Sequence, residues 1–312
     1  MSTQIQVEPS PPLRVVLVGM SLLRDRLTEK KLVITAEVSP PKGAGIKKLR
    51  EHIQLISPHV TAINITDCQR SVVRMASWAA CKIIMDLGAE PVLQVTCRDR
   101  NSIALQADLM GASALGIQNV LCLTGDPVKV GDSPDSRSVF EYESIKLLQT
   151  ASNLQRGRDA QNLKMNAPTR FVLGSVVNPT ARGGLGQLER MKKKIAAGAI
   201  FFQTQANYDI EDFCSFLRLT QDVDTSILAG ILVLHSPDIA HFINENIPGI
   251  QLPKSVIKRL ENASDPEKEG IEIAIESMLQ LKDHCAGFHV MTIRREPLIP
   301  LVVKGFYERI SI

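Results

Sequence analysis

Two carboxylates, each close to the end of an apolar segment, are the residues of this sequence best suited to acid–base chemistry. Glu37 lies near the end of the apolar run Leu32–Val38, and Asp126 directly follows the run Asn119–Gly125. A carboxyl group in a poorly solvated site has a raised pKa and can donate a proton near neutral pH. One acid in an apolar pocket and a second in a polar one can divide the roles of proton donor and anion. From position alone, the alternative is that both acids are solvated loop residues.

Polar residues also stand at the ends of other apolar runs. Metal ligands are scarce among them, so no metal site is expected. His289 lies within an apolar run, which is more typical of a hydrogen-bonded core residue than of a ligand contact. The Gly-rich run 183–186 precedes a helical pattern and could cradle a phosphate, but it lacks the Lys-Ser/Thr pair of a P-loop, which favours a flexible loop. The polar set at the run ends is Glu37, Thr66, Asp67, Thr96, Cys97, Arg98, Thr124, Gly125, Asp126, Asn178, Thr204, Gln205, Thr292 and Arg294.

The elements that must position these residues form a repeated unit of one apolar run and one helical pattern. Five of the seven steps between successive run starts are 27 to 31 residues, the length of a strand, a helix and two short loops. Near-continuous apolar strands are typical of a parallel sheet covered by helices, and eight units predict an α/β fold, a parallel (β/α)8 TIM barrel. The eight runs are Leu32–Val38, Val60–Thr66, Pro91–Cys97, Asn119–Gly125, Phe171–Val177, Ala199–Gln205, Ser226–Leu234 and Gly287–Ile293.

The segments between the strands have apolar residues at spacings of three and four, which predicts helices. Two insertions break the regular spacing: a polar loop over 126–139 and two or three helices over 236–282. No long linker divides the chain, so we expect an N-terminal tail over 1–20 and one barrel domain over 21–312. The predicted helices are Ile46–Ile56, Val72–Leu87, Ile103–Leu115, Ser144–Leu154, Leu185–Ala197, Ile210–Leu219, Pro237–Asn246, Lys254–Glu261, Pro266–Leu281 and Pro297–Tyr307.

Composition narrows the class of protein. A chain of 312 residues that is 44% hydrophobic and 22% charged suits a globular protein, and a net charge of +3 with dispersed Lys and Arg argues against nucleic acid as a partner. Six scattered cysteines without a C-x-x-C pair indicate reduced thiols and a cytoplasmic location. The first apolar run, Val15–Leu23, is too short to cross a bilayer, so we expect no membrane insertion.

Eight strand-end motifs together resemble the methylenetetrahydrofolate reductase family. The resemblance covers the chain from about residue 20, in order, with one motif for each strand end. It implies a (β/α)8 barrel that binds FAD at the carboxyl ends of its strands and reduces 5,10-methylenetetrahydrofolate to 5-methyltetrahydrofolate, with electrons passing through the flavin in two half-reactions. The motifs are TAEVSPPKG (35–43), NITD (64–67), QVTC (94–97), LCLTGDP (121–127), SVVNP (175–179), KKKIAAGAIFFQTQANYD (192–209), GILVL (230–234) and GFHVMTI (287–293).

The same resemblance implies roles for individual residues. Glu37 is similar to the acid that protonates the folate and opens its five-membered ring, Asp126 to the residue that binds the pterin near the flavin, and Gln205 to the glutamine that positions the folate. The residues implied to hold FAD are Thr66, Gln94, Leu123, Thr124, Gly125, Asp126, Phe140, Ser175, Val177 and Lys194.

Other features remain open at this stage. The electron donor implied by the family is NAD(P)H or a partner electron-transfer subunit, and a homo-oligomer or hetero-oligomer is expected. The sequence after the sixth strand, Gln205–Tyr208, departs from the aromatic-rich segment of some members, which affects the stacking partner for pterin or nicotinamide. Two rival hypotheses are a pterin-binding barrel methyltransferase, which would bind no flavin, and a structural subunit of an electron-transfer complex.

Overall fold

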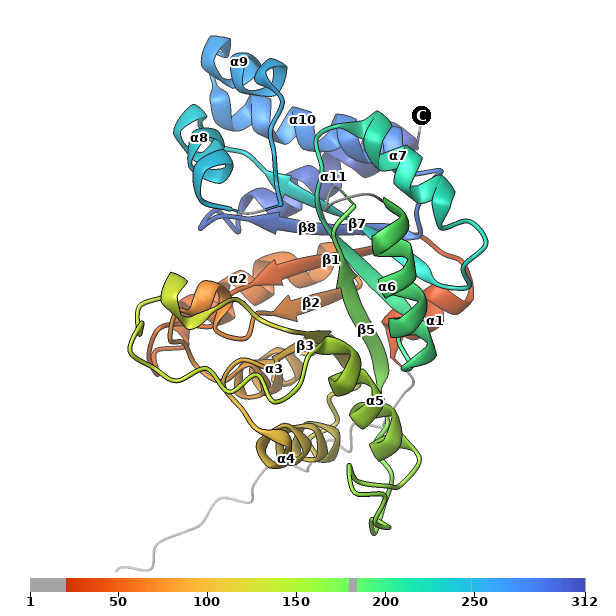
Figure 1. Cartoon of the computed structure of the whole chain (residues 1–312). Helices are drawn as coiled ribbons and strands as arrows, with labels where there is room; N and C mark the ends of the chain where they lie inside the picture. The colour runs from red at the N-terminus through yellow and green to blue at the C-terminus, as the bar shows by residue number, and fades with distance from the viewer. Residues whose placement is uncertain (1–20, 180–183, 248, 312) are drawn as a thin grey trace, which may run out of the picture.

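The computed structural model describes residues 21–179, 184–247 and 249–311, and its centre is a closed barrel of eight parallel strands (Figure 1). Each strand pairs with its neighbour in the sequence, and β1 pairs with β8 to close the ring. The predicted (β/α)8 fold and all eight predicted strands are therefore confirmed, with ends that differ by a few residues. The strands are β1 Val33–Val38, β2 Ala62–Ile65, β3 Pro91–Thr96, β4 Asn119–Leu123, β5 Val172–Val177, β6 Phe201–Ala206, β7 Ser226–Val233 and β8 Gly287–Thr292.

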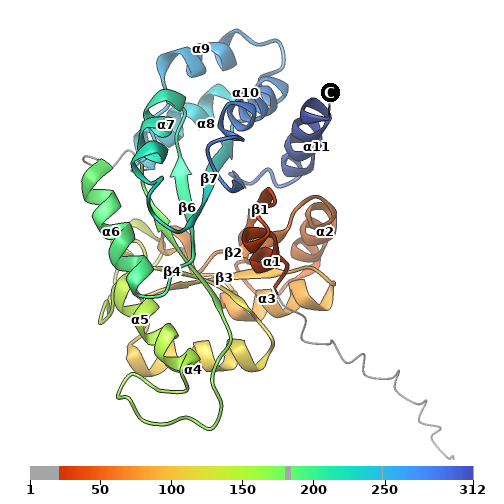
Figure 2. The same ribbon diagram turned by 90° about the vertical axis from the view of Figure 1, so that its right-hand side faces the viewer.

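Helices surround the barrel on its outside, as the two perpendicular views show (Figures 1 and 2). Helices α2, α3, α4, α5, α6, α7, α10 and α11 follow the strands in turn, which gives every strand an outer apolar layer. The α-helices are α1 Leu22–Thr28, α2 Lys47–Ile56, α3 Ser77–Asp86, α4 Ser102–Ala114, α5 Ser144–Gln155, α6 Gly184–Ala196, α7 Ile210–Leu219, α8 Pro237–Asn246, α9 Lys254–Asn262, α10 Pro266–Leu281 and α11 Leu298–Ile310.

Side-chain alternation along each strand separates two cores. Residues such as Val33, Ala62 and Val92 point inward and form one cluster inside the barrel, whereas their neighbours Ile34 and Ile63 join the larger cluster beneath the helices. Both faces of each strand are thus apolar in the lower part of the barrel. Polar side chains take over at inward positions nearer the carboxyl ends, where the ring of strands opens.

Helix α1 closes the amino-terminal end of the barrel. Leu23 is fully buried in the inner cluster, and Ser21 caps the helix by accepting the Arg24 N–H at 3.1 Å. The Ser21 hydroxyl also contacts Glu90 at 2.8 Å and Asn119 at 2.6 Å, next to β3 and β4. A buried leucine side chain, on a helix held by the polar contacts of Ser21, therefore fills this end of the barrel. The predicted tail over 1–20 lies outside the described residues.

One helix begins later than the sequence pattern indicated. The prediction placed it over 72–87, but α3 begins at Ser77. Cys68, Arg70 and Ser71 have φ values of 46°, 53° and 57°, and Val72 is extended, so the chain makes an irregular turn before the helix can start. The segment 67–76, called the β2–α3 loop below, lies over the strand ends. The Gly-rich run 183–186 begins outside the described residues.

The insertion after β7 consists of α8, α9 and α10, as the sequence predicted. Its apolar residues form a satellite cluster with the upper ends of β6, β7 and β8, which includes Leu232, Leu234, Ile243 and Ile273. Phe242 of α8 reaches the β2–α3 loop, where the Arg70 guanidinium lies 5.5 Å from the centre of its ring. The insertion therefore builds one wall of the barrel opening, opposite the polar loops after β2 to β4.

Candidate functional site

Glu37 points into the barrel opening and is held by three side chains from three other segments. Its Oε2 accepts a hydrogen bond of 2.9 Å from Gln94 Nε2 of β3 and lies 3.6 Å from His289 Nε2 of β8. Its Oε1 accepts a bond of 3.0 Å from Gln69 Nε2 in the β2–α3 loop. The Glu37 side chain is 14% exposed, so it is buried at the edge of the solvent-accessible opening. A strand-end carboxylate with its orientation fixed on both oxygens is suited to proton transfer.

The electrostatics of Glu37 differ from the sequence-based hypothesis. Burial raises the pKa of the Glu37 carboxyl group, as we expected, but the contact with His289, with the charge that this ring carries when it is protonated, and the bonds from Gln94 and Gln69 together lower the pKa further than burial raises it. The net pKa is below the ordinary value of 4.5. The expectation that burial alone keeps this acid protonated is therefore wrong, because donors to a carboxylate stabilise its ionised form.

His289 is buried and hydrogen-bonded, as the sequence analysis predicted, and it also faces Glu37. It is 3% exposed and inward-facing on β8, and its Nδ1 contacts Thr35 Oγ1 at 2.9 Å while its Nε2 faces Glu37. The sequence feature that could have indicated its contact with Glu37 is its strand position. His289 is a polar residue on the inward side of the last strand and pairs in register with Thr35 on β1. A lone histidine in an apolar run does not by itself reveal this pairing, since the partner comes from the opposite end of the chain.

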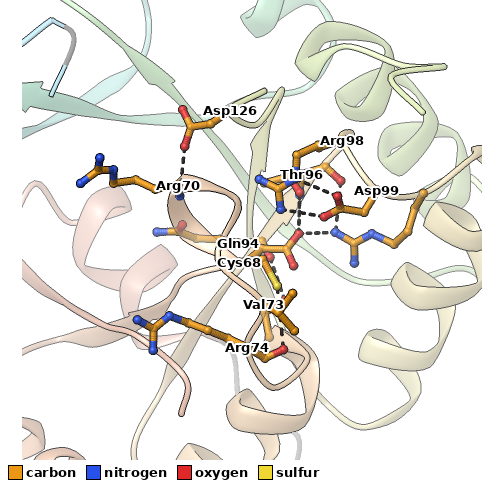
Figure 3. Close-up of polar contacts among 12 residues, drawn as sticks. Cys68, Arg70, Val73, Arg74, Gln94, Thr96, Arg98, Asp99 and Asp126 are labelled. Atoms are coloured by element: carbon orange, nitrogen blue, oxygen red, sulfur yellow. Dashed lines mark hydrogen bonds and ion pairs between the residues drawn. The ribbon is translucent and has the colours of Figure 1, made fainter. Parts of the chain in front are cut away.

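Asp126 receives its contact from the same loop that holds Glu37. The backbone N–H of Arg70 donates to Asp126 Oδ2 at 3.1 Å, as Figure 3 shows, and the preceding residue, Gln69, donates to Glu37. Asp126 is exposed and Glu37 is not, which agrees with the expected division into one polar and one shielded acid. Two consecutive residues of the β2–α3 loop therefore bridge the two acids.

A buried ion-pair network fixes the ends of β2 and β3 beneath this loop. Asp67 Oδ2 accepts hydrogen bonds from the Thr96 N–H at 2.8 Å and hydroxyl at 2.9 Å, and it also pairs with Arg100. Arg98 is 2% exposed and forms two bonds of 2.7 Å to Asp99 (Figure 3). Each charged side chain of the network has an oppositely charged partner, although the buried Arg100 Nε has no hydrogen-bond partner. We assign the network the structural role of positioning Gln94 and the β2–α3 loop.

The end of β4 approaches the end of β3 closely. Gly125 has a φ of 95°, and a Cβ atom on it would lie 3.0 Å from Thr96 Cβ and 3.2 Å from Arg98 Cβ. Only glycine fits this conformation and this space without strain. The Thr124 hydroxyl accepts the Ser144 N–H at 3.3 Å, which ties the loop to the start of α5, and Leu123 borders the inner cluster. The backbone before Asp126 is thereby fixed and exposed toward the opening.

Lys194 is a buried cation at the end of β5. It is 7% exposed, and its Nζ donates a bond of 2.6 Å to the Val176 carbonyl. Burial, with a smaller effect of Arg190, lowers the pKa of Lys194 to about 8. Ser175 and Val177 do not join it at the opening: Ser175 donates to the Cys122 carbonyl at 2.9 Å and Val177 packs in the helix-facing core. Their side chains face away from the barrel interior, and only their backbone groups can contact a ligand.

The remaining predicted site residues lie around the opening without contacting Glu37. Thr66 is fully buried and donates to Ser39 Oγ at 3.2 Å, and Gln205 is exposed at the end of β6. Phe140 is 36% exposed, with a φ of 41°, and follows Val139, whose N–H donates to the Arg98 carbonyl at 2.7 Å. The structure thus joins Glu37 directly to Gln94 and distributes the other residues along the ends of β2 to β6.

The donor set around the opening fits a flavin nucleotide in its chemistry. Lys194 offers a desolvated cation for a phosphate, the glycine at 125 allows the chain after β4 to pack closely against the Thr96 and Arg98 side chains, and the hydroxyl and amide groups of Thr66 and Gln94 are neutral partners. Among the described residues, no group of three or more His, Cys, Asp or Glu side chains could hold a metal ion. No described helix combines the length and apolar character needed to cross a membrane.

Two surface cavities lie elsewhere. They have volumes of about 420 and 400 Å³ and are lined by residues at the amino-terminal ends of strands, including His59 and Lys304 in the first and Gln118 and Arg170 in the second. Neither cavity contains Glu37, Asp126 or the residues that contact them. All six cysteines are free thiols, in agreement with the sequence analysis, and none takes part in the contacts of the two acids.

The fold and the site define a parallel α/β barrel with an acid-centred polar opening at the carboxyl ends of its strands. Comparison with protein families gives a more specific assignment. The chain belongs to the methylenetetrahydrofolate reductase family, whose family model matches residues 22–306. The family resemblance inferred from the strand-end motifs is thereby confirmed.

Three individual relatives have low sequence identity to this chain over the aligned residues. Methylenetetrahydrofolate reductase 2 of Schizosaccharomyces pombe is 24% identical over 91% of this chain and 46% of its own length. A probable methylenetetrahydrofolate reductase (NADPH) of Caenorhabditis elegans is 22% identical over 91% of this chain and 44% of its own length. The 5,10-methylenetetrahydrofolate reductase of Pectobacterium carotovorum is 24% identical over 68% of this chain and 67% of its own. The chain spans less than half the length of the yeast and nematode relatives.

Solved structures of similar shape support the barrel architecture. A Clostridium thermocellum protein described as binding two copies of 5-methyl-5,6,7,8-tetrahydrofolic acid has a TM-score of 0.63, with 18% identity, over 92% of this chain and 99% of that one. An oxaloacetate acetylhydrolase in complex with an inhibitor has a TM-score of 0.51 and 10% identity. At these identities the likeness establishes the fold alone.

Proposed function

We propose that this protein reduces 5,10-methylenetetrahydrofolate to 5-methyltetrahydrofolate with FAD as its cofactor. The observation that carries the proposal is the position of Glu37 in a chain of this family: a carboxyl group at the barrel opening, oriented on both oxygens by Gln94 and Gln69. Bound FAD would supply the chemistry of accepting two electrons from a donor and passing them to the folate as hydride. The folate-binding Clostridium barrel of the same fold also supports a pterin ligand.

In this proposal Glu37 gives a proton to the folate and so opens its five-membered ring. The role requires a protonated carboxyl group, whereas the donors around Glu37 favour the ionised form. A pterin placed against Glu37 would take the position of the Gln69 side chain and exclude water. Loss of that donor removes the smallest cause of the lowered pKa, and the exclusion of water strengthens burial, which raises the pKa, while His289 and Gln94 continue to lower it. We propose that the balance shifts toward the protonated form of Glu37 as the substrate binds.

Asp126 and Gln205 would orient the substrate. Asp126 is an exposed carboxylate that accepts a backbone N–H at 3.1 Å, and the N–H groups of a pterin ring are donors of the same kind. Gln205 is exposed at the end of β6 and can both donate and accept. Asp126 follows β4 and Gln205 lies at the end of β6, on the side of the ring of strands opposite β1, so a flat ring that contacts both would present one edge to Glu37.

The residues proposed to hold FAD fall into two groups according to whether their side chains or only their backbone groups can contact the cofactor. Lys194 would pair with a phosphate, and the backbone from Leu123 to Asp126 would contact the ring system, aided by Thr66, Gln94, Thr124, Gly125 and Phe140. Ser175 and Val177 would contribute backbone contacts alone, because their side chains are buried toward the helices. The electron donor would be NAD(P)H or a partner electron-transfer subunit, the assembly a homo-oligomer or hetero-oligomer, and the location cytoplasmic.

The test is a pair of half-reactions followed on the purified protein. The proposal expects bound or added FAD to be bleached anaerobically by NADH, NADPH or a reduced low-potential protein donor, and the colour to return on addition of methylenetetrahydrofolate. Mass spectrometry of the folate must then show 5-methyltetrahydrofolate. A protein that binds folate but no flavin would instead support a pterin-binding methyltransferase. A protein that binds neither would support a structural subunit of an electron-transfer complex.

A further inference from the structure

A continuous chain of neutral polar side chains crosses the barrel interior beneath Glu37. Asn64 of β2 and Gln203 of β6 form a reciprocal amide pair, with bonds of 2.8 and 3.1 Å. Gln203 Nε2 also donates to Thr35 Oγ1 of β1 at 3.2 Å, and Thr35 contacts His289 Nδ1 of β8 at 2.9 Å. These four residues are between 0% and 3% exposed, so no bulk water competes for their hydrogen bonds.

The orientation of the Gln203 amide follows from counting its donors. In the observed orientation both N–H groups of Nε2 have acceptors, one on Asn64 and one on Thr35. If the Gln203 amide were reversed, its Nε2 would face the donor Asn64 Nδ2. Reversal of both amides would restore an acceptor on Asn64 for only one N–H of Gln203 and would leave the other buried N–H without an acceptor. An unpaired buried donor costs about 1–3 kcal/mol. The observed orientation is therefore the favoured one, and Thr35 Oγ1 acts as an acceptor toward Gln203.

The direction of the Thr35 hydroxyl then determines the state of His289. Because Thr35 Oγ1 accepts from Gln203, its own proton must be donated elsewhere, and the two candidates are His289 Nδ1 at 2.9 Å and the Phe288 carbonyl at 3.5 Å. The shorter contact lies in the hydrogen-bonding range and the longer one at its limit. His289 Nδ1 is therefore an acceptor. The proton of the neutral ring must sit on Nε2, the nitrogen that faces Glu37 Oε2 at 3.6 Å.

We propose that Gln203 and Thr35 are positioning residues that hold His289 as its Nε2–H tautomer and so direct this N–H at Glu37. The role in turnover rests on the proposed function. Once Glu37 has given its proton to the substrate, the Nε2–H stabilises the carboxylate that remains. The Gln94 amide, which donates to Glu37 Oε2, and the Nε2–H of His289, which faces the same oxygen at 3.6 Å, then keep the used acid oriented until it is protonated again. Among the described residues, the titratable side chain in contact with His289 is that of Glu37.

The experiment combines a spectroscopic and a kinetic measurement. The ¹⁵N chemical shifts of the His289 ring, assigned by comparison with His289→Gln, report which nitrogen carries the proton in the wild-type holoenzyme. We expect the proton on Nε2. Thr35→Val removes the hydroxyl, and Gln203→Met removes the amide that donates to it. Each variant should give a mixture of His289 tautomers. Thr35→Ser retains the hydroxyl and should behave as the wild type, which controls for the loss of packing.

The kinetic measurement is the pH profile of flavin reoxidation by methylenetetrahydrofolate. A weaker donor to the Glu37 carboxylate raises the pKa of Glu37. The limb of the pH profile that Glu37 controls should therefore move to higher pH by roughly half a unit to one unit in Thr35→Val and Gln203→Met. It should not move in Thr35→Ser. A wild-type ring protonated on Nδ1, or a tautomer unaltered in Thr35→Val, overturns the proposal. An Nε2–H ring in a protein without folate turnover would instead refute the proposed function and leave the tautomer assignment standing.

Discussion

Gln94 on β3 donates a hydrogen bond of 2.9 Å to Glu37 on β1, although strand β2 separates the two strands in the sheet. The contact is possible because both side chains point into the barrel, where non-adjacent strands face one another. Gln94 therefore acts on the acid directly, although the family resemblance implied a cofactor contact for it. The orientation and the proton affinity of Glu37 depend on residues from β1, β3, β8 and the β2–α3 loop together.

Replacement of Glu37 by Gln should separate the two half-reactions. The amide is nearly isosteric but cannot donate an acidic proton, so folate turnover should fall by about 100-fold or more, whereas flavin reduction by the donor should change little. Stopped-flow absorbance measures each step separately. Glu51→Gln, on the exposed face of α2, is the matched control. Equal loss in both half-reactions would contradict the acid role.

The lowered pKa of Glu37 also predicts how stability depends on pH. A group whose pKa is lower in the folded state than in the unfolded state stabilises the fold above the unfolded value, and this stabilisation is lost as the pH falls through the folded value. For Glu37 the decline should begin near pH 4.5 and continue below it. Denaturant unfolding of wild type and Glu37→Gln from pH 7 to pH 3.5 should show their difference shrinking toward acid. A difference that grows toward acid would mean that burial outweighs the donors.

Much of this architecture could be predicted from the sequence, because strand and helix periodicity are local properties. The eight strands and the two acids required no tertiary information. The contact between Glu37 and His289 could not be predicted without tertiary information, because it joins the first strand to the last. The late start of α3 could not be predicted either, because it depends on the left-handed backbone of Cys68, Arg70 and Ser71. The strand around Ser175 was predicted from its local pattern, but the alternation of side chains along it, which directs Ser175 toward the helices, was not.

Flavin affinity should decrease above pH 8 if Lys194 binds a phosphate. Burial lowers the pKa of Lys194 to about 8, so the side chain loses its charge within a range where an exposed lysine stays protonated. Below that pH the ammonium group can pair with the phosphate, and above it the attraction is lost. Equilibrium titration of the apoprotein with FAD between pH 6.5 and 9.5 should show the decline.

The matched variants for this prediction are neighbours on α6. Lys194→Met should bind FAD weakly at every pH and abolish the decline, whereas Lys193→Met, on the exposed side of the helix, should retain the wild-type dependence. A decline that persists in Lys194→Met would assign the titration to another group.

Gly125 offers a test of how tightly the β3 and β4 ends must pack to place Asp126. Gly125→Ala combines a left-handed φ of 95° with a Cβ only 3.0 Å from Thr96 Cβ, so both backbone strain and overpacking oppose it. Gly88→Ala has a similar φ of 79° but no atom within 4 Å of its Cβ, so backbone strain alone opposes it. We expect Gly88→Ala to lower the free energy of unfolding by about 1 kcal/mol and Gly125→Ala by about 2–4 kcal/mol.

The difference between these two variants isolates the contact between β3 and β4. Since relief of that contact requires the loop to move, Gly125→Ala should also displace Asp126 from the Arg70 N–H and weaken folate binding, while Gly88→Ala should leave folate binding unchanged. Chemical denaturation and folate titration of the two variants measure both effects. If Gly125→Ala destabilises the fold no more than Gly88→Ala and retains full folate affinity, the close approach of the strand ends does not position the acid, and the backbone from Leu123 to Asp126 must be held by its ligands instead.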